Sequence, residues 1–151
     1  MNTDTFLSER LAVIATIDPD VTAAGTVITD EIDMSKYRRV MFIVMAGTLG
    51  SSATLDFSVK GGASSNAGSH STAITGKSIT QLTQAGTDES DRQAIVEVSA
   101  TEVRAQSLRY IEGSLVVATA SSDAAVIVLG EPAHALPATE IDLASVAEIV
   151  T

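Results

Sequence analysis

Gly76, Lys77 and Ser78 form the triplet that ends the phosphate-binding loop of many nucleotide hydrolases. That loop needs another glycine five positions before Gly76, because the backbone must wrap around the phosphates, and Ser71 stands there instead. Such a loop should also leave a buried strand and open a helix, whereas "SHSTA" precedes this one and "ITQLT", with its β-branched residues, follows it. We therefore predict a glycine turn between two short β segments, with Lys77 and Ser78 facing solvent. The buried side of these segments is expected to consist of Ile74, Ile79 and Leu82.

The two histidines, His70 and His134, are the next candidates for chemistry. A zinc site usually takes three or four strong ligands, and this chain offers two distant histidines and no cysteine. His70 lies in the Gly/Ser-rich segment 61–72, which we expect to be a mobile surface loop with a solvated histidine. His134 stands between prolines and is expected at the surface or at an interface.

Three acidic clusters, at residues 18–20, 30–33 and 88–91, carry oxygen ligands of the kind that calcium prefers. None has the acidic spacing and glycine of an EF-hand loop, so we interpret them as hydrated loops. The basic "KYRR" at 36–39 flanks the most apolar stretch, where its charges would oppose aggregation. Serine is common, but no Gly-x-Ser-x-Gly elbow is present. We predict no catalytic residues, no metal and no cofactor, and therefore no enzyme.

Composition limits the partners of this 151-residue chain. Its formal net charge of −10 would repel phosphate backbones, and 3% aromatic residues leave few platforms on which bases could stack. The longest apolar run, at 40–47, is far shorter than the roughly 20 residues of a membrane helix. We expect neither nucleic acid nor membrane as a partner.

Short runs of β-branched and apolar residues, separated by Gly, Ser, Asp and Thr clusters, recur along the chain. Residues 54–60 alternate apolar and polar, which predicts a strand with one exposed face. Residues 39–46 are almost continuously apolar, which predicts a strand covered on both faces. The strand at 11–17 is expected to end in a turn at 18–20.

A short helical turn is expected after Ser99, because Glu102 follows it with the spacing of a capping box. The whole pattern predicts an all-β fold, an antiparallel β-sandwich or barrel of about seven or eight strands with short helical turns. We also expect an extended C-terminal arm after the last strand of this fold.

The expected organisation is a β-sandwich domain at 1–131 and, in the same domain, a C-terminal arm at 132–151. Three interpretations of the apolar residues in the arm stay open: they pack on their own sandwich, they dock on a neighbouring subunit, or the arm is frayed and disordered. The candidate partner-binding residues of the two termini are Phe6, Leu7, Pro132, His134, Pro137, Ile141, Leu143, Val146 and Ile149.

Three segments in order, "DMSKYRRVMFIVMAGTLGSSATLDFSV", "ITGKSITQLTQAGTDESDRQAIVEV" and "LRYIEGSLVVATASSDAAVIVLGEP", span residues 33–132. Their order and apolar spacing resemble small structural proteins encoded in the head gene clusters of tailed bacteriophages. The resemblance rests on no catalytic residue.

The resemblance implies a head decoration or cement protein, made in the cytoplasm of the bacterial host and located on the head surface of the virion. Its implied partners are the major capsid protein, whose neighbouring subunits it would bridge, and itself as a homo-oligomer. A tail, neck or fibre component is the alternative, followed by a small-ligand-binding module or an enzyme.

Overall fold

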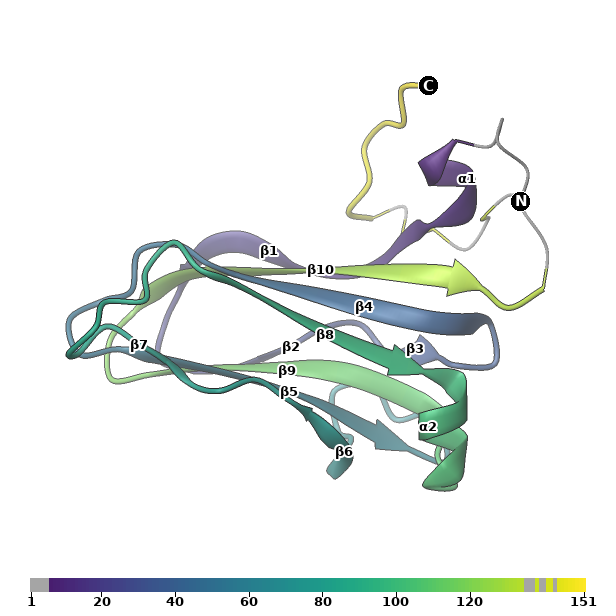
Figure 1. The fold of residues 1–151 in the computed structure, drawn as a ribbon, viewed down its shortest axis with the longest axis horizontal. Helices are drawn as coiled ribbons and strands as arrows, with labels where there is room; N and C mark the ends of the chain where they lie inside the picture. The colour runs from purple at the N-terminus through teal and green to yellow at the C-terminus, as the bar shows by residue number, and fades with distance from the viewer. Residues whose placement is uncertain (1–5, 135–137, 139–140, 143) are drawn as a thin grey trace.

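Two antiparallel sheets packed face to face form the molecule (Figure 1). The computed structural model describes residues 6–134, 138, 141–142 and 144–151. The elements, in chain order, are α1 (Leu7–Arg10), β1 (Ala12–Thr22), β2 (Gly25–Ile28), β3 (Ile32–Asp33), β4 (Tyr37–Ala46), β5 (Thr54–Gly62), β6 (Thr72–Ser78), β7 (Leu82–Thr83), β8 (Gln93–Ser99), α2 (Ala100–Ala105), β9 (Tyr110–Ala118) and β10 (Ser122–Pro132).

The first sheet, here called sheet A, has the strand order β1-β10-β4-β8. The second, sheet B, has the order β2-β9-β5-β6, with β3 also paired to β9 and β7 to β5. This arrangement confirms the predicted all-β sandwich. The described residues form more strands than expected because β3 and β7 are two-residue pairings that sequence patterns do not reveal.

The core lies between the sheets and depends on one close approach. Phe42 of β4 and Phe57 of β5 pack with ring centroids 5.5 Å apart, and both side chains are buried. Gly113 of β9 lies beneath them. A Cβ at that position would stand 2.8 Å from Cζ of Phe57 and 3.1 Å from Cε1 of Phe42. Only glycine leaves the rings in place.

Strand β4 shows the two-residue alternation of a strand with one buried face. Val40, Phe42 and Val44 are buried, whereas Met41 and Ile43 are only half-buried and point away from the core. The prediction that residues 39–46 are covered on both faces is therefore wrong for the outer face of sheet A.

The expected turn at 18–20 is also wrong, because β1 continues through it to Thr22. A bulge between Ile17 and Asp20 accommodates Pro19. Proline is tolerated there because β1 is an edge strand, on which a missing N–H costs no ladder hydrogen bond.

The predicted capping box is confirmed at the start of α2. The Ser99 hydroxyl accepts a hydrogen bond from the Glu102 amide at 3.3 Å, and the Glu102 carboxylate accepts one from the Ser99 amide at 2.8 Å.

Gly113→Ala tests the close approach of the sheets. We expect the free energy of unfolding to fall by about 1–3 kcal/mol, because both rings must shift in a filled core. Chemical denaturation measures this loss. Gly68→Ala is the control without a clash, since no atom lies within 4 Å of the added Cβ, although its positive φ of 75° adds some strain. Equal losses in the two variants would contradict the packing argument.

Candidate functional site

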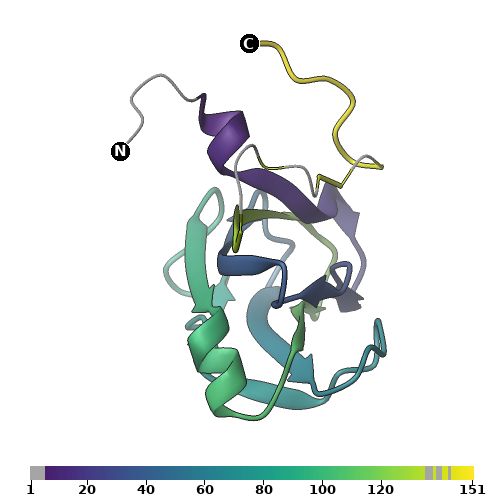
Figure 2. The same ribbon diagram turned by 90° about the vertical axis from the view of Figure 1, so that its right-hand side faces the viewer.

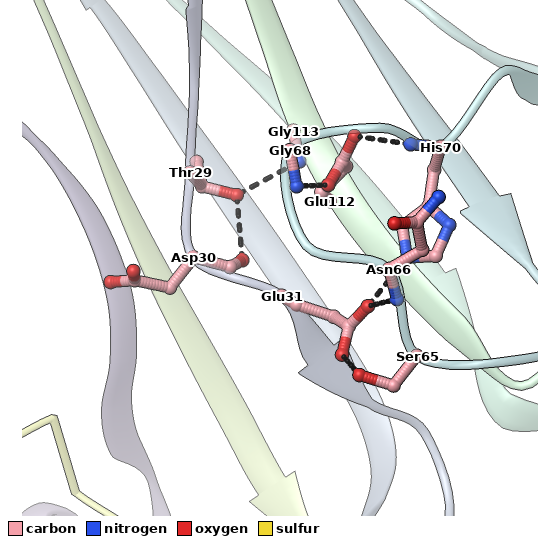
Figure 3. A network of polar contacts seen from close by, with 9 residues as sticks. All are labelled: Thr29, Asp30, Glu31, Ser65, Asn66, Gly68, His70, Glu112 and Gly113. Atoms are coloured by element: carbon pink, nitrogen blue, oxygen red, sulfur yellow. Dashed lines mark hydrogen bonds and ion pairs between the residues drawn. The ribbon is translucent and has the colours of Figure 1, made fainter.

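The main polar cluster joins segments from three parts of the chain on the outer face of sheet B (Figure 3). Glu112 of β9 is fully buried there. One of its carboxylate oxygens accepts a hydrogen bond from the amide of Gly68 at 2.8 Å, and the other from the amide of His70 at 3.0 Å. These donors offset the cost of burying a carboxylate. They also fix the segment between β5 and β6 onto the sheet.

Glu31 holds the same segment from the other side (Figure 3). Its carboxylate accepts hydrogen bonds from the Ser65 hydroxyl at 2.6 Å and the Asn66 amide at 2.7 Å. Nε2 of His70 lies 2.7 Å from it. Burial raises the pKa of Glu31, but the hydrogen bonds from Ser65, Asn66 and His70 outweigh burial and lower the pKa below its usual value. We call Glu31, Ser65, Asn66, His70 and Glu112 the polar clamp.

The expectation of a solvated His70 is wrong, since 7% of this residue is exposed. Five backbone and side-chain groups of the segment around it bond to Glu31 and Glu112, so the segment is no free loop. Sequence patterns cannot reveal these contacts, because Glu31 and Glu112 lie 39 and 42 positions away from His70.

The polar clamp has the residue types of a catalytic triad in an order that cannot perform its chemistry. In a Ser-His-Asp set the histidine lies between the serine and the acid and removes the hydroxyl proton. Here the carboxylate of Glu31 lies between Ser65 and His70 and bonds to both. The geometry therefore serves to hold the chain in place. Across the described part of the chain, no three His, Asp or Glu side chains are grouped so that they could hold a metal ion.

The Gly-Lys-Ser triplet lies within β6, not in a turn between strands. Ser58 pairs with Ser78 and Lys60 with Ala73, so residues 74–77 bulge opposite Val59 alone, and Gly76 adopts a positive φ of 72°. Ile74 is buried, as predicted, and Ile79 and Leu82 pack partly buried against the core.

The expectation that Lys77 faces solvent is wrong. Its ammonium group lies 2.8 Å from the carboxylate of Glu102, and its side chain is mostly buried. The hydrogen bond from Lys77, followed by that from the Ser99 amide, lowers the pKa of Glu102 to about 2. The lysine thus joins β6 to the start of α2.

Charged residues of the other clusters also find partners within the chain. Arg109 forms two hydrogen bonds with Asp33, at 2.9 and 2.6 Å, and this contact lowers the pKa of Asp33 well below its usual range. Arg38 of the basic patch lies 3.7 Å from Glu131.

Helix α1 and the described residues of the C-terminal segment lie beyond the outer face of sheet A (Figures 1 and 2). The amide of Asp142 donates to the carbonyl of Val13 at 2.8 Å, and the hydroxyls of Thr16 and Ser145 are 2.8 Å apart. This part of the C-terminal segment packs on its own sandwich, as one of the three interpretations expected.

Between α1, β1 and the C-terminal segment lies a groove of about 390 Å³, with Leu7, Val146 and Ile149 in its lining. Among the candidate partner-binding residues, those that are exposed are Phe6, Leu7, His134 and Ile149, and those that are half-buried are Pro132, Ile141 and Val146. Pro137 and Leu143 lie outside the described residues. Docking of the exposed group on another subunit stays a prediction.

The largest feature that the sequence reasoning missed is the outer face of sheet A. Cross-strand pairing places Ile127, Ile43 and Ile95 in one row across β10, β4 and β8. Of these, Ile95 is 63% and Ile127 is 36% exposed. The neighbouring rows add the half-buried Leu129 with Met41, and Ala125, which is itself buried, with the half-buried Met45. We call these seven residues the outer apolar face. The sequence feature that could have revealed this face is the almost continuously apolar run at 39–46.

Comparisons with known proteins leave the family open. No protein-family model matches the chain, and no curated protein matches it significantly. Neither described helix is long and apolar enough to cross a membrane.

Two solved structures are weakly similar. One is the K1 cleaved adhesin domain of Lys-gingipain from Porphyromonas gingivalis W83, with 17% identity and a TM-score of 0.35 over 70% of this chain and 59% of that one. The other is the structure of infectious bursal disease virus Gx strain, with 12% identity and a TM-score of 0.39 over 83% of this chain and 33% of that one. The chain spans less than two thirds of either. At these TM-scores the likenesses carry no argument about function.

Glu31→Ala tests the polar clamp. We expect the free energy of unfolding to fall by about 1–3 kcal/mol near neutral pH, because three donors lose their acceptor. Asp30→Ala is the matched control, since it removes the same charge from the adjacent, exposed position. Denaturation curves for both variants measure the difference.

The lowered pKa of Glu31 gives this prediction a pH dependence. A carboxylate with a lowered pKa stabilises the fold above its unfolded pKa, and that contribution is lost as the pH falls through the folded pKa. The difference in the free energy of unfolding between the native protein and Glu31→Ala should therefore become smaller below about pH 4.5. A difference in the free energy of unfolding that grows in acid would contradict a stabilising role for the ionised Glu31 carboxylate.

Proposed function

We propose that this chain is a structural virion protein, a decoration or cement protein that binds the outside of a phage head and bridges neighbouring major capsid subunits. The observation that carries the proposal is the outer apolar face of sheet A. A binding protein of this kind needs a surface and edges that fit a partner, and it needs no reactive group.

The outer apolar face has the character of a surface that a partner covers. The β-branched and apolar run of β4 is typical of a strand covered on both faces, yet the chain covers only one. Contiguous exposed apolar surface is uncommon on proteins that act alone, and it marks interaction sites. The groove beside α1 extends this surface past Leu129 towards the exposed Leu7 and Ile149.

The contacts of the polar clamp support the same proposal, because they make the molecule rigid. Glu31, His70 and Glu112 bond to one another's segments and hold the chain in a fixed shape. A rigid module loses little conformational entropy when it binds, so more of its contact free energy remains for affinity.

A tail, neck or fibre component would have the same needs, and copy number separates it from a decoration protein. We expect quantitative mass spectrometry of purified particles to find hundreds of copies per virion, present also in tailless heads. A handful of copies, or presence only in tails, would instead favour the alternative. Absence from particles would refute both.

Ile127→Lys tests the binding surface directly. We expect at least about a tenfold loss of affinity for heads that lack this protein, measured by co-sedimentation, because a charge would be buried against the shell. Thr26→Lys on β2 is the matched control, since Thr26 is exposed and pairs with Val116 on the outer face of sheet B. Equal binding by both variants would place the contact elsewhere on the molecule.

A further inference from the structure

We propose that two copies of this chain pair through β8, antiparallel and across a twofold axis at Ile95, so that two copies of sheet A become one continuous sheet. The proposal does not depend on the function proposed above. It rests on the open edge of β8, on the atoms which that edge presents, and on the charges that select one register.

Strand β8 is the outermost strand of sheet A, with β4 as its neighbour. Its other side forms no ladder within the described part of the chain, although β6 passes near it. In Figure 2, β8 is the teal arrow on the left, above α2. Its pairing with β4 runs from Gln93 to Ser99 without a register shift, so the open edge is straight and regular.

The other edges of the two sheets are protected in the ways expected of natural proteins. The β1 edge carries bulges and Pro19, and Asp142 donates to its backbone. The β6 edge is broken by the bulge around Gly76, and β2 is only four residues long. Strand β8 has no proline and no bulge, and Glu97 is its one charged residue.

The hydrogen bonds at the ends of β8 show which residues face outward. The amide of Ala46 donates to the carbonyl of Arg92, so the even-numbered residues bond to β4. The amide of Ser99 instead donates to Glu102. Because bonding alternates along an antiparallel strand, Gln93, Ile95 and Glu97 direct their N–H and C=O groups to the open edge.

A second β8 can therefore pair with the first only in registers that place these odd-numbered residues opposite one another. With the axis at Ile95, the two Ile95 side chains meet and each Glu97 faces Gln93 of the second copy. That amide can donate to the carboxylate. A shift of the axis to Val96 would place Glu97 against Ile95, and a shift to Glu97 would oppose two like charges, both of which are unfavourable. Glu97 thus selects the register.

The selected register also joins the outer apolar faces. The row of Ile127, Ile43 and Ile95 would continue through the second Ile95 into the same row of the second copy. The 63% exposure of Ile95 would then be explained by the partner that covers it.

The first experiment measures the mass of the full chain in solution by analytical ultracentrifugation. We expect a dimer for the native protein and a monomer for Ile95→Lys, because like charges would meet at the axis. Ile127→Lys is the control, since it alters the same face two strands from the edge and should remain a dimer. A native monomer would overturn the proposal, and so would loss of the dimer in both variants, which would indicate face-to-face stacking.

Cysteine cross-linking tests the register, because the native chain contains no cysteine. In an antiparallel hydrogen-bonded pair the Cα atoms lie about 5.5 Å apart, which suits a disulfide. We expect Ile95→Cys to form a covalent dimer on mild oxidation and Glu97→Cys to remain monomeric in denaturing gels, its two sulfurs being held more than about 10 Å apart. Cross-linking of Glu97→Cys alone would overturn the register, and failure of both would overturn the edge pairing. Neither outcome bears on whether the protein binds heads.

Discussion

The structure depends on the close approach of the two sheets over Gly113. Phe42 and Phe57 meet there, and no side chain other than hydrogen fits beneath them. This contact fixes which residues of β4, β5 and β9 point inward, and the two-residue period of a strand then fixes all the others. Met41 and Ile43 must face outward on sheet A, and Glu112 must face outward on sheet B. The two outer faces are thus consequences of one contact in the core.

The outer faces of the two sheets differ in how the chain covers them. On sheet B the chain covers its own surface, and the carboxylates of Glu112 and Glu31 receive amide, hydroxyl and imidazole groups from the covering segment. Among the described residues only the Ser114 hydroxyl is buried there without a partner. On sheet A the side chains are apolar and the chain supplies only partial cover near β1. Polar groups need directional partners that a fold must supply itself, whereas an apolar face can be covered by any surface of matching shape.

The edges of the sheets also differ, since some are blocked by the chain itself and one is open. On the β1 edge a bulge, a proline and a bond from the C-terminal segment prevent further pairing, and on the β6 edge a bulge does so. Strand β8 keeps a regular backbone next to the outer apolar face. Its open edge and this face therefore lie next to each other on one side of the molecule, and Ile95 belongs to both.

The sequence alone determined the features that depend on neighbours along the chain. It determined the all-β class, the alternation at 54–60, the capping box of Ser99 and the absence of a phosphate loop around Lys77. Each of these features depends on residues that lie only a few positions apart in the chain. Only the tertiary structure decided which features of distant segments meet. His70 is buried because Glu31 and Glu112, some forty positions away, bond to its segment, and β1 passes through 18–20 because β10 continues beside it. The run at 39–46 shows the limit best: its composition predicts cover on both faces, but the fold buries one face and leaves Met41, Ile43 and Met45 on the other only half-buried.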